Sequence, residues 1–178
     1  MNSNTQRIAI TAVLTALLLA VGPLAINVGP VPFTLQTLVI ALVASVSSTR
    51  VSLTAIGLYL LLGAFGLPVF AGFKGGFVFL VGPTAGYLWS FLLFAPIIGL
   101  SFKKWANVWG LIVTNILASV VTLTIGTIWL IVSMHMSIAA GIAAGMTPFV
   151  LSSALKITIV VIVALAVRKV QARTSLAF

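Results

Sequence analysis

The sequence contains no acidic side chain and no cysteine, and these two absences restrict its chemistry. Without Asp or Glu it has no carboxylate pair for acid–base catalysis and no acid to orient its single histidine, His135. Without cysteine it has no disulfide, thiol nucleophile or thiolate metal site. A histidine without such partners is a poor metal ligand. The sequence therefore predicts no catalytic residue, no metal site and no cofactor.

Charged residues are also scarce. They make up 5% of the chain, against about 25% in an ordinary globular domain. Hydrophobic residues make up 62%, and the mean hydropathy is +1.34. We therefore interpret the chain as an integral membrane protein. Its Lys and Arg residues are scattered and have no soluble domain to carry them, so the lipid bilayer, and not nucleic acid, is their expected partner.

What is abundant is glycine and proline inside apolar sequence. Residues 59–88 hold seven glycines and two prolines, and residues 22–32 hold a second such cluster. Broken backbone at membrane depth persists only where protein buries it or where it lines a cavity. The two segments therefore predict folded-in loops over a ligand site. The glycines do not form a P-loop, because no Gly-Lys-Ser/Thr follows them, so the chain has no ATPase motif of its own.

The apolar segments predict an all-α membrane protein, a bundle of six transmembrane helices in one domain, residues 1–178. The expected helices are about 7–24, 33–46, 51–65, 84–100, 105–132 and 148–167. If the N-terminus is inside, most basic residues are cytoplasmic. These are Arg7, Arg50, Lys103, Lys104, Arg168, Lys169 and Arg173. We thus expect a multi-pass protein of the cell membrane with both termini in the cytoplasm.

Lys156 is the one cation expected inside a helix. It lies 12 residues before Arg168, about 18 Å along a helix, so it should lie within the hydrocarbon core. An intramembrane lysine indicates a functional site, although it can also extend to the outer headgroups. Ser153 lies one turn earlier on the same face, and either faces the site or bonds the helix backbone.

Other polar residues have two interpretations each. Lys74, at the tip of the third connection, lies at the mouth of a site or is simply solvated. Gln36 and Asn115 bond a ligand or hold helices together, and for Asn115 we favour the second. Ala12 and Ala16 belong to a stripe of small residues on the first helix, which allows close approach of another helix, either within this bundle or from a partner subunit.

Three motifs carry a resemblance to a known family. They are Pro30-Val-Pro-Phe-Thr-Leu-Gln36, Gly66-Leu-Pro-Val-Phe-Ala-Gly72 and Gly82-Pro-Thr-Ala-Gly-Tyr-Leu88. In order and spacing they resemble the BioY family, the biotin-specific S components of energy-coupling factor (ECF) transporters. The resemblance implies a six-helix S-component fold in which loops 1–2 and 3–4 cap a vitamin pocket near the outer face.

The resemblance also implies partners and site residues. Ala12 and Ala16 match the small-residue motif that docks an energising transmembrane subunit, which works with two ATPase subunits. The family's last helix usually carries an Asp followed three residues later by a Lys, and Ser153 and Lys156 hold these two positions. The expected substrate-binding residues are Lys156, Ser153, Gln36, Phe33, Phe70, Lys74 and Tyr87.

Biotin suits such a site. Its bicycle is apolar, its ureido group needs a few hydrogen bonds, and its carboxylate can pair with a lone lysine. Two alternatives stay open. The chain is either a paralogue that captures another small heterocyclic vitamin or metabolite, or a structural membrane subunit without a ligand.

Overall fold

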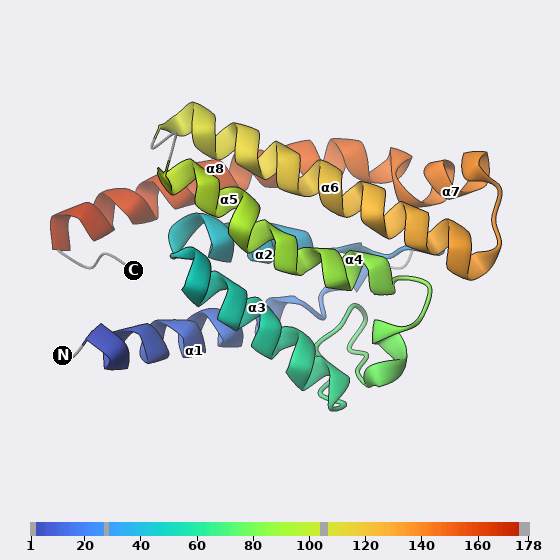
Figure 1. Ribbon diagram of the computed structural model, residues 1–178, viewed down its shortest axis with the longest axis horizontal. Helices are drawn as coiled ribbons and strands as arrows, with labels where there is room; N and C mark the ends of the chain where they lie inside the picture. The colour runs from blue at the N-terminus through green and yellow to red at the C-terminus, as the bar shows by residue number, and fades with distance from the viewer. Residues whose placement is uncertain (1–2, 27–28, 104–106, 175–178) are drawn as a thin grey trace.

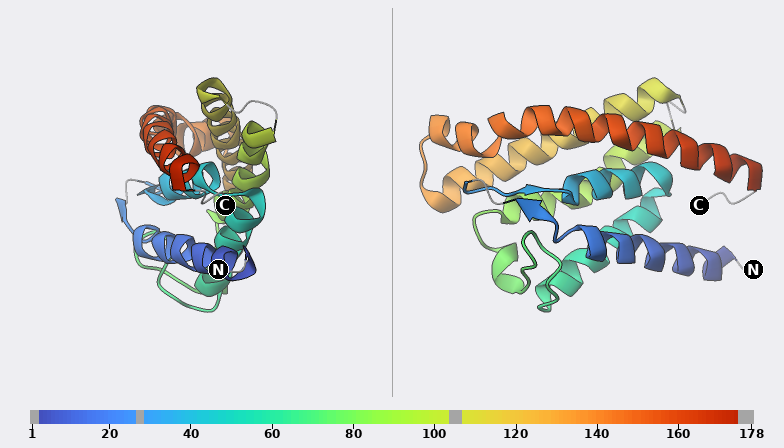
Figure 2. Two further views of the ribbon diagram at one scale, coloured as in Figure 1. Left: turned by 90° about the vertical axis from the view of Figure 1, so that its left-hand side faces the viewer. Right: turned by 180° about the vertical axis from the view of Figure 1, so that it is seen from behind.

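Helices lie side by side along one long axis in the computed structural model, which describes residues 3–26, 29–103 and 107–174 (Figure 1). The start of α1 and the end of α8 lie at one end of the bundle, and the long loops lie at the other (Figure 1). Viewed along this axis, α8 and α6 lie on one side, α1 and α3 on the opposite side, and α2 between them (Figure 2). The helices in order are α1 (Ser3–Val21), α2 (Gln36–Val46), α3 (Thr49–Ala64), α4 (Ala85–Ser90), α5 (Phe94–Lys103), α6 (Val108–Met134), α7 (Ile138–Gly145) and α8 (Thr147–Thr174).

The first connection contains a small hairpin. Helix α1 ends before Gly22-Pro23, and β1 (Ala25–Ile26) then pairs antiparallel with β2 (Phe33–Thr34). Helix α2 therefore begins at Gln36, later than the expected residue 33, because Phe33 and Thr34 use their backbone in the hairpin. Helix α1 begins at Ser3, earlier than the expected residue 7, and ends at Val21 instead of residue 24. The polar residues before Arg7 also form part of α1, and Pro23 prevents the helix from reaching residue 24.

The middle of the chain is interrupted more often than expected. A 3₁₀ turn, η1 (Phe77–Leu80), interrupts the loop after α3, which covers Thr49–Ala64 where 51–65 was expected. The predicted helix 84–100 consists of α4 and α5 joined by a second 3₁₀ turn, η2 (Phe91–Leu93). Pro96 has no N–H to donate to the preceding turn, which accounts for the tightened backbone there.

The last two predicted helices differ at their ends. Helix α6 begins at Val108 because the side chain of Asn107 accepts a hydrogen bond from Gly110 N at 2.8 Å, and it runs to Met134; residues 105–106 of the prediction 105–132 lie outside the described residues. The expected connection after α6 contains α7. Helix α8 extends past the expected residue 167, and Arg168 and Gln171 donate to the last carbonyls of α2, Ser45 O and Val46 O, both at 3.0 Å.

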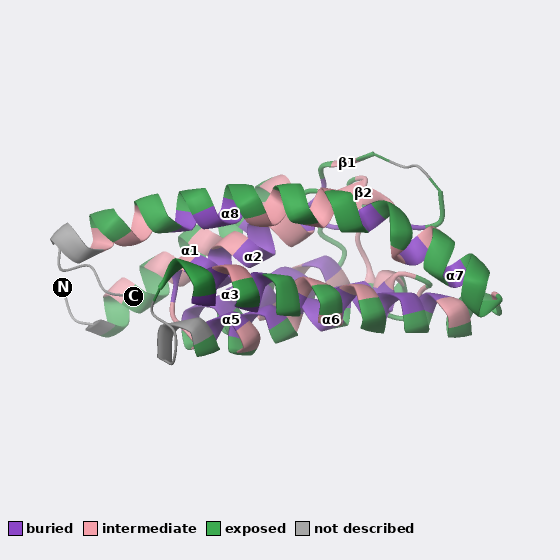
Figure 3. Ribbon diagram, turned by 90° about the horizontal axis from the view of Figure 1, so that it is seen from above, coloured by how far each residue is buried: buried purple, intermediate pink, exposed green. Residues whose placement is uncertain are grey.

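The core lies where α2, α3, α5 and α6 face one another, while the outward face of α8 is largely exposed (Figure 3). Many of the exposed residues are Leu, Ile and Val, as expected for a surface in lipid. Among the described residues, three helical spans are long and apolar enough to cross a membrane: Asn4–Val21, Val108–Met134 and Ile138–Gln171. Helix α2, α3 and the α4–α5 segment are shorter apolar helices, and with α1, α6 and α7–α8 they complete the predicted six-helix bundle in the described chain.

Asn115 holds two helices together. It is fully buried on α6, and its amide donates to Ser45 Oγ on α2 at 3.1 Å and to Leu111 O at 2.9 Å. The interpretation of Asn115 as an interhelical bond is confirmed, and it places a polar contact below the loop end of the bundle.

Candidate ligand-binding site

A cavity of about 450 Å³ lies at the loop end of the bundle. Ligand pockets typically measure about 300–1,000 Å³, so it is large enough for a small molecule. Both loop segments rich in glycine and proline contribute to its wall, together with α2, α4, α6 and α8. Its apolar and aromatic lining comprises Val31, Phe70, Val78, Phe79, Leu88, Phe91, Leu123, Phe149 and Ile157.

The loop after α3 is fixed over this cavity by a three-residue turn. Phe70 N donates to Lys74 O at 2.8 Å, and Lys74 N donates back to Phe70 O at 3.3 Å. Gly72, with φ of 74°, and Phe73, with φ of 58°, take the left-handed conformation at the tip of the turn. Gly72 N also donates to Pro23 O at 2.9 Å, so the end of α1 and this loop are joined.

Lys156 points to the inside of the protein. From α8, its Nζ donates to Thr34 O at 2.7 Å and to Thr37 Oγ1 at 3.0 Å, and all three residues line the cavity. These contacts disfavour the alternative in which the lysine extends to the headgroups. An ammonium group has three N–H donors, so one remains for a ligand in the cavity. The sequence has no acidic side chain to neutralise this charge.

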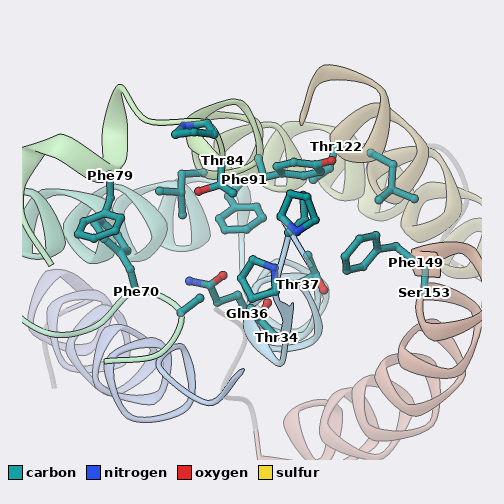
Figure 4. A pocket seen from close by; sticks show the side chains of 18 of the residues that line it. Thr34, Gln36, Thr37, Phe70, Phe79, Thr84, Phe91, Thr122, Phe149 and Ser153 are labelled. Atoms are coloured by element: carbon teal, nitrogen blue, oxygen red, sulfur yellow. The ribbon is translucent and has the colours of Figure 1, made fainter. Parts of the chain in front are cut away.

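Gln36 lies at the start of α2, buried beside the cavity (Figure 4). Its Nε2 donates to Tyr59 Oη at 2.6 Å, and that hydroxyl donates to Val69 O at 3.0 Å. The bonds fix the amide nitrogen toward α3, so the amide oxygen is the group of Gln36 that remains for a ligand. Tyr59 was not expected from the sequence, and it acts by positioning Gln36.

Phe70, Lys74 and Ser153 also line the cavity. The buried ring of Phe70 packs edge-on against Tyr59 and Phe79, with centroid distances of 5.8 and 6.2 Å. Lys74 is exposed, with its Nζ 5.9 Å from the centroid of the Phe79 ring, which places its charge at the mouth. Ser153 is half-buried on α8 and lies next to Phe149 in Figure 4.

Tyr87 borders the cavity, but its hydroxyl is used elsewhere. Tyr87 Oη donates to Gly145 O at 2.8 Å and lies 3.1 Å from Thr127 Oγ1. A Cβ at Gly126 would collide with the Tyr87 ring, so glycine is required there for the ring to pack against α6. Tyr87 therefore offers a ligand its ring face and not its hydroxyl.

Phe33 differs from the expectation, since it does not appear among the described residues that line the cavity. Its ring stacks on that of Phe149, with centroids 4.6 Å apart, and Phe149 lines the wall. Phe33 therefore packs against a residue of the cavity wall and does not line the cavity itself. The structure also leaves Ala12 and Ala16 exposed on α1, away from the cavity and from the bundle interior.

Several lining residues were not predicted. They are hydroxyl-bearing or aromatic: Thr34, Thr37, Thr84, Ser119, Thr122, Phe79, Phe91 and Phe149. Thr34 and Thr84 lie in two of the three motifs quoted from the sequence, which was the available signal. The others occupy ordinary apolar helices or loop sequence, where one hydroxyl or ring is not distinctive.

The cavity thus combines a single inward-facing cation, neutral hydrogen-bonding groups and aromatic surface. Among the described residues no group of three potential metal ligands occurs. Such a lining is chemically suited to a small, largely apolar molecule with a polar or anionic group. The fold and the cavity together define a helical membrane protein that holds a small ligand under two loops.

Comparison with known proteins identifies its family. The sequence model of the BioY family matches residues 1–173, and this chain belongs to that family. Biotin transporter BioY2 of Lactococcus lactis subsp. cremoris is 38% identical over 98% of this chain and 96% of its own length. Biotin transporter BioY of Thermotoga maritima is 37% identical over 89% of this chain and 94% of its own length.

A solved structure has the same fold. It is the crystal structure of the S-component for biotin from an ECF-type ABC transporter, and it superposes with a TM-score of 0.86 over 95% of each chain at 24% identity. The predicted family and the predicted S-component fold are both confirmed.

Proposed function

We propose that this protein is the substrate-binding membrane subunit of a biotin uptake transporter. The observation that carries the proposal is the Lys156 ammonium group on the wall of a largely apolar cavity, in a chain of the BioY family. The names of the relatives, which are biotin transporters, support the choice of ligand.

The chemistry of biotin fits each part of the cavity. Its carboxylate pairs with the remaining N–H of Lys156, in a charge-assisted bond that the low-dielectric surroundings strengthen. Its bicycle lies against the aromatic wall, including Phe70 and the ring of Tyr87. Neutral groups such as the Gln36 amide and the Ser153 hydroxyl supply hydrogen bonds, and Lys74 attracts the anion at the mouth.

Energy for transport comes from other subunits in this proposal. The exposed face of α1 around Ala12 and Ala16 docks an energising transmembrane subunit, which works with two ATPase subunits. The protein lies in the cell membrane with both termini in the cytoplasm and the cavity at the outer end. The shared end of the two termini and the basic residues near it support this orientation.

Ser153 supports a second candidate, a paralogue that captures another small heterocyclic vitamin or metabolite, because the BioY family usually has an Asp at this position. Labelled-biotin binding to the purified protein, competed with other vitamins, separates the candidates. Saturable binding that only biotin and its close analogues displace supports biotin capture. Displacement by a different vitamin at lower concentration supports the paralogue, and no displaceable ligand supports a structural subunit.

A further inference from the structure

A second groove lies between α1, α2 and α8, at the end of the bundle opposite to the ligand cavity. Its volume is about 420 Å³. Leu42 and Val46, near the end of α2, lie between the walls that α1 and α8 provide, because these two helices lie on either side of α2 (Figure 2). The wall on α1 consists of Ala9, Ile10, Val13, Leu14 and Leu17. The ligand cavity shares none of these residues and does not account for the groove.

The groove offers almost no polar group to an occupant. Among the described residues that line it, two are polar, Ser47 and Gln171. Both donate to the backbone of α2: Ser47 Oγ to Val43 O at 2.8 Å, and Gln171 Nε2 to Val46 O at 3.0 Å. Water occupies a cavity only where polar partners are available, so the occupant of this groove is apolar along its length.

The length of the groove matches one leaflet of a bilayer. Ala9 and Leu17 lie eight residues apart, which is about 12 Å along a helix. The hydrocarbon core of a bilayer is about 30 Å thick, so each leaflet contributes about 15 Å. One acyl chain from the leaflet at this end of the bundle therefore fits along the groove.

Two arginines lie at the end of the groove where the headgroups of that leaflet are expected. Arg7 is exposed, and it lies on the same face of α1 as Ile10 and Leu14, three and seven residues further on. On α8, Arg168 follows the lining residue Val167, and its Nε donates to Ser45 O at 3.0 Å, which holds the guanidinium at the end of α2. No acidic side chain occurs in the sequence to neutralise either charge.

We infer that this groove is a binding site for an anionic phospholipid, with one acyl chain along α1 and the phosphate at Arg7 and Arg168. A guanidinium group binds phosphate through paired, charge-assisted N–H bonds. Basic groups between membrane helices are a typical site for acidic headgroups. In the proposed orientation the lipid belongs to the inner leaflet. The inference does not depend on the identity of the ligand in the cavity.

The groove suits a flexible chain better than a packed helix. Close contact between membrane helices uses small residues, which on α1 include Ala12 and Ala16, and neither of them lines the groove. The groove wall instead carries branched side chains such as Val13, Leu14 and Leu17. The lipid site and the proposed docking stripe are therefore neighbouring but different faces of α1.

Lipid retention tests the site. Wild-type protein is placed in vesicles of equal parts phosphatidylglycerol, which is anionic, and phosphatidylcholine, which is neutral, and is then extracted in mild detergent. Native mass spectrometry should show one phosphatidylglycerol retained by each protein. Wild-type protein without a retained phospholipid overturns the inference and leaves the groove to a segment of a partner subunit. A lipid-free dimer overturns it in favour of a second copy of this chain.

Val13→Trp tests the acyl chain, because it places a ring in the groove at a residue that is 68% exposed and so can accept a larger side chain. The variant should retain about tenfold less phospholipid, the effect of displacing about two methylene groups. Ile8→Trp is the matched control, since Ile8 is 71% exposed on the same helix and does not line the groove. It should retain lipid as wild type does. Equal retention in both variants overturns the inference.

Arg7→Gln tests the headgroup and leaves the groove unchanged. The preference for phosphatidylglycerol over phosphatidylcholine should fall about fivefold, the effect of one basic residue near an anionic lipid. Lys169→Gln is the control, because Lys169 is exposed two residues from Val167 and from Gln171, and side chains two apart do not share a helix face. It should keep the wild-type preference. An equal loss of preference in both variants would indicate only general attraction to the membrane surface and overturn the assignment of the phosphate.

Discussion

In the proposed orientation, the inner half of α6 (residues 108–118) and its outer half (residues 119–134) carry the same kinds of polar residue but use them differently. In the inner half, Thr114 and the amide nitrogen of Asn115 bond neighbouring protein groups, and Asn115 joins α6 to α2. In the outer half, Ser119 and Thr122 line the cavity, and Thr122 Oγ1 has no partner within the described chain. In an apolar protein, therefore, the presence of a polar group does not indicate a site. What indicates a site is a polar group on the cavity wall, since Asn115 Oδ1 is also buried without a partner within the described chain and yet does not line the cavity.

The largest effect is expected outside both halves, on the exposed face of α1. Changing Ala12 and Ala16 together to Trp places two large rings where close helix contact is needed. Assembly with the energising subunits, measured by co-purification, should be lost, while biotin binding by the isolated protein should be unchanged. Normal assembly of this variant would mean that the stripe has no docking role.

Lys156, on α8, tests the cation on the cavity wall. Lys156→Met keeps the length of the side chain and removes a charge-assisted bond worth roughly 1.5–3 kcal/mol. Biotin should bind about ten- to a hundredfold more weakly in a titration with labelled ligand. Lys169→Met, at an exposed lysine near the opposite end of α8, is the control and should bind as wild type does.

Ser153→Asp complements that experiment, because it introduces the Asp that BioY proteins usually carry three residues before this lysine. With the carboxylate of biotin at Lys156, the added acid should lower the affinity by charge repulsion, whereas with the ureido group there it should raise the affinity by accepting a ureido N–H. Unchanged affinity in both Lys156→Met and Ser153→Asp would remove α8 from the site.

The inner half should respond in stability and not in binding. Asn115→Leu leaves Ser45 Oγ without the amide donor and should lower the free energy of unfolding by about 1–3 kcal/mol. The affinity for biotin should not change. Adding Ser45→Ala should recover part of the loss, because replacing both partners by apolar groups is less costly than replacing one. Weaker biotin binding in proportion to the stability loss would show that the two halves are not separate.

The smallest expected effect is a change in the hydrogen-exchange rates of backbone amides. Backbone amides in residues 29–35 and 68–80 should exchange hydrogen more slowly with saturating biotin, because both segments contribute to the cavity wall. Amides of the inner half of α6 should show no change. Equal exchange in these segments with and without biotin would mean that the loops do not respond to the ligand.

The general fold could be predicted from the sequence, and six of the seven expected site residues, all except Phe33, line the cavity. Glycine and proline located the two loops, and the lone Lys156 in an apolar helix indicated an inward-facing cation, because both signals are local. The helix boundaries that were predicted wrongly depend on contacts with residues far away in the sequence. Phe33 is in a strand because β1 lies opposite to it, and α8 extends past residue 167, where Arg168 and Gln171 bond the end of α2. Whether Thr122 bonds its own helix cannot be deduced from its position in the sequence.

One backbone hydrogen bond joins the end of α1 to the turn over the cavity. Pro23 O, directly beyond α1, accepts from Gly72 N in the turn over the cavity at 2.9 Å. A hydrogen bond tolerates only small changes in length and angle, so α1 cannot turn far about its axis unless this bond breaks or the turn moves with it. A force on the exposed face of α1 around Ala12 and Ala16 would therefore be transmitted through this bond to the turn that covers the cavity.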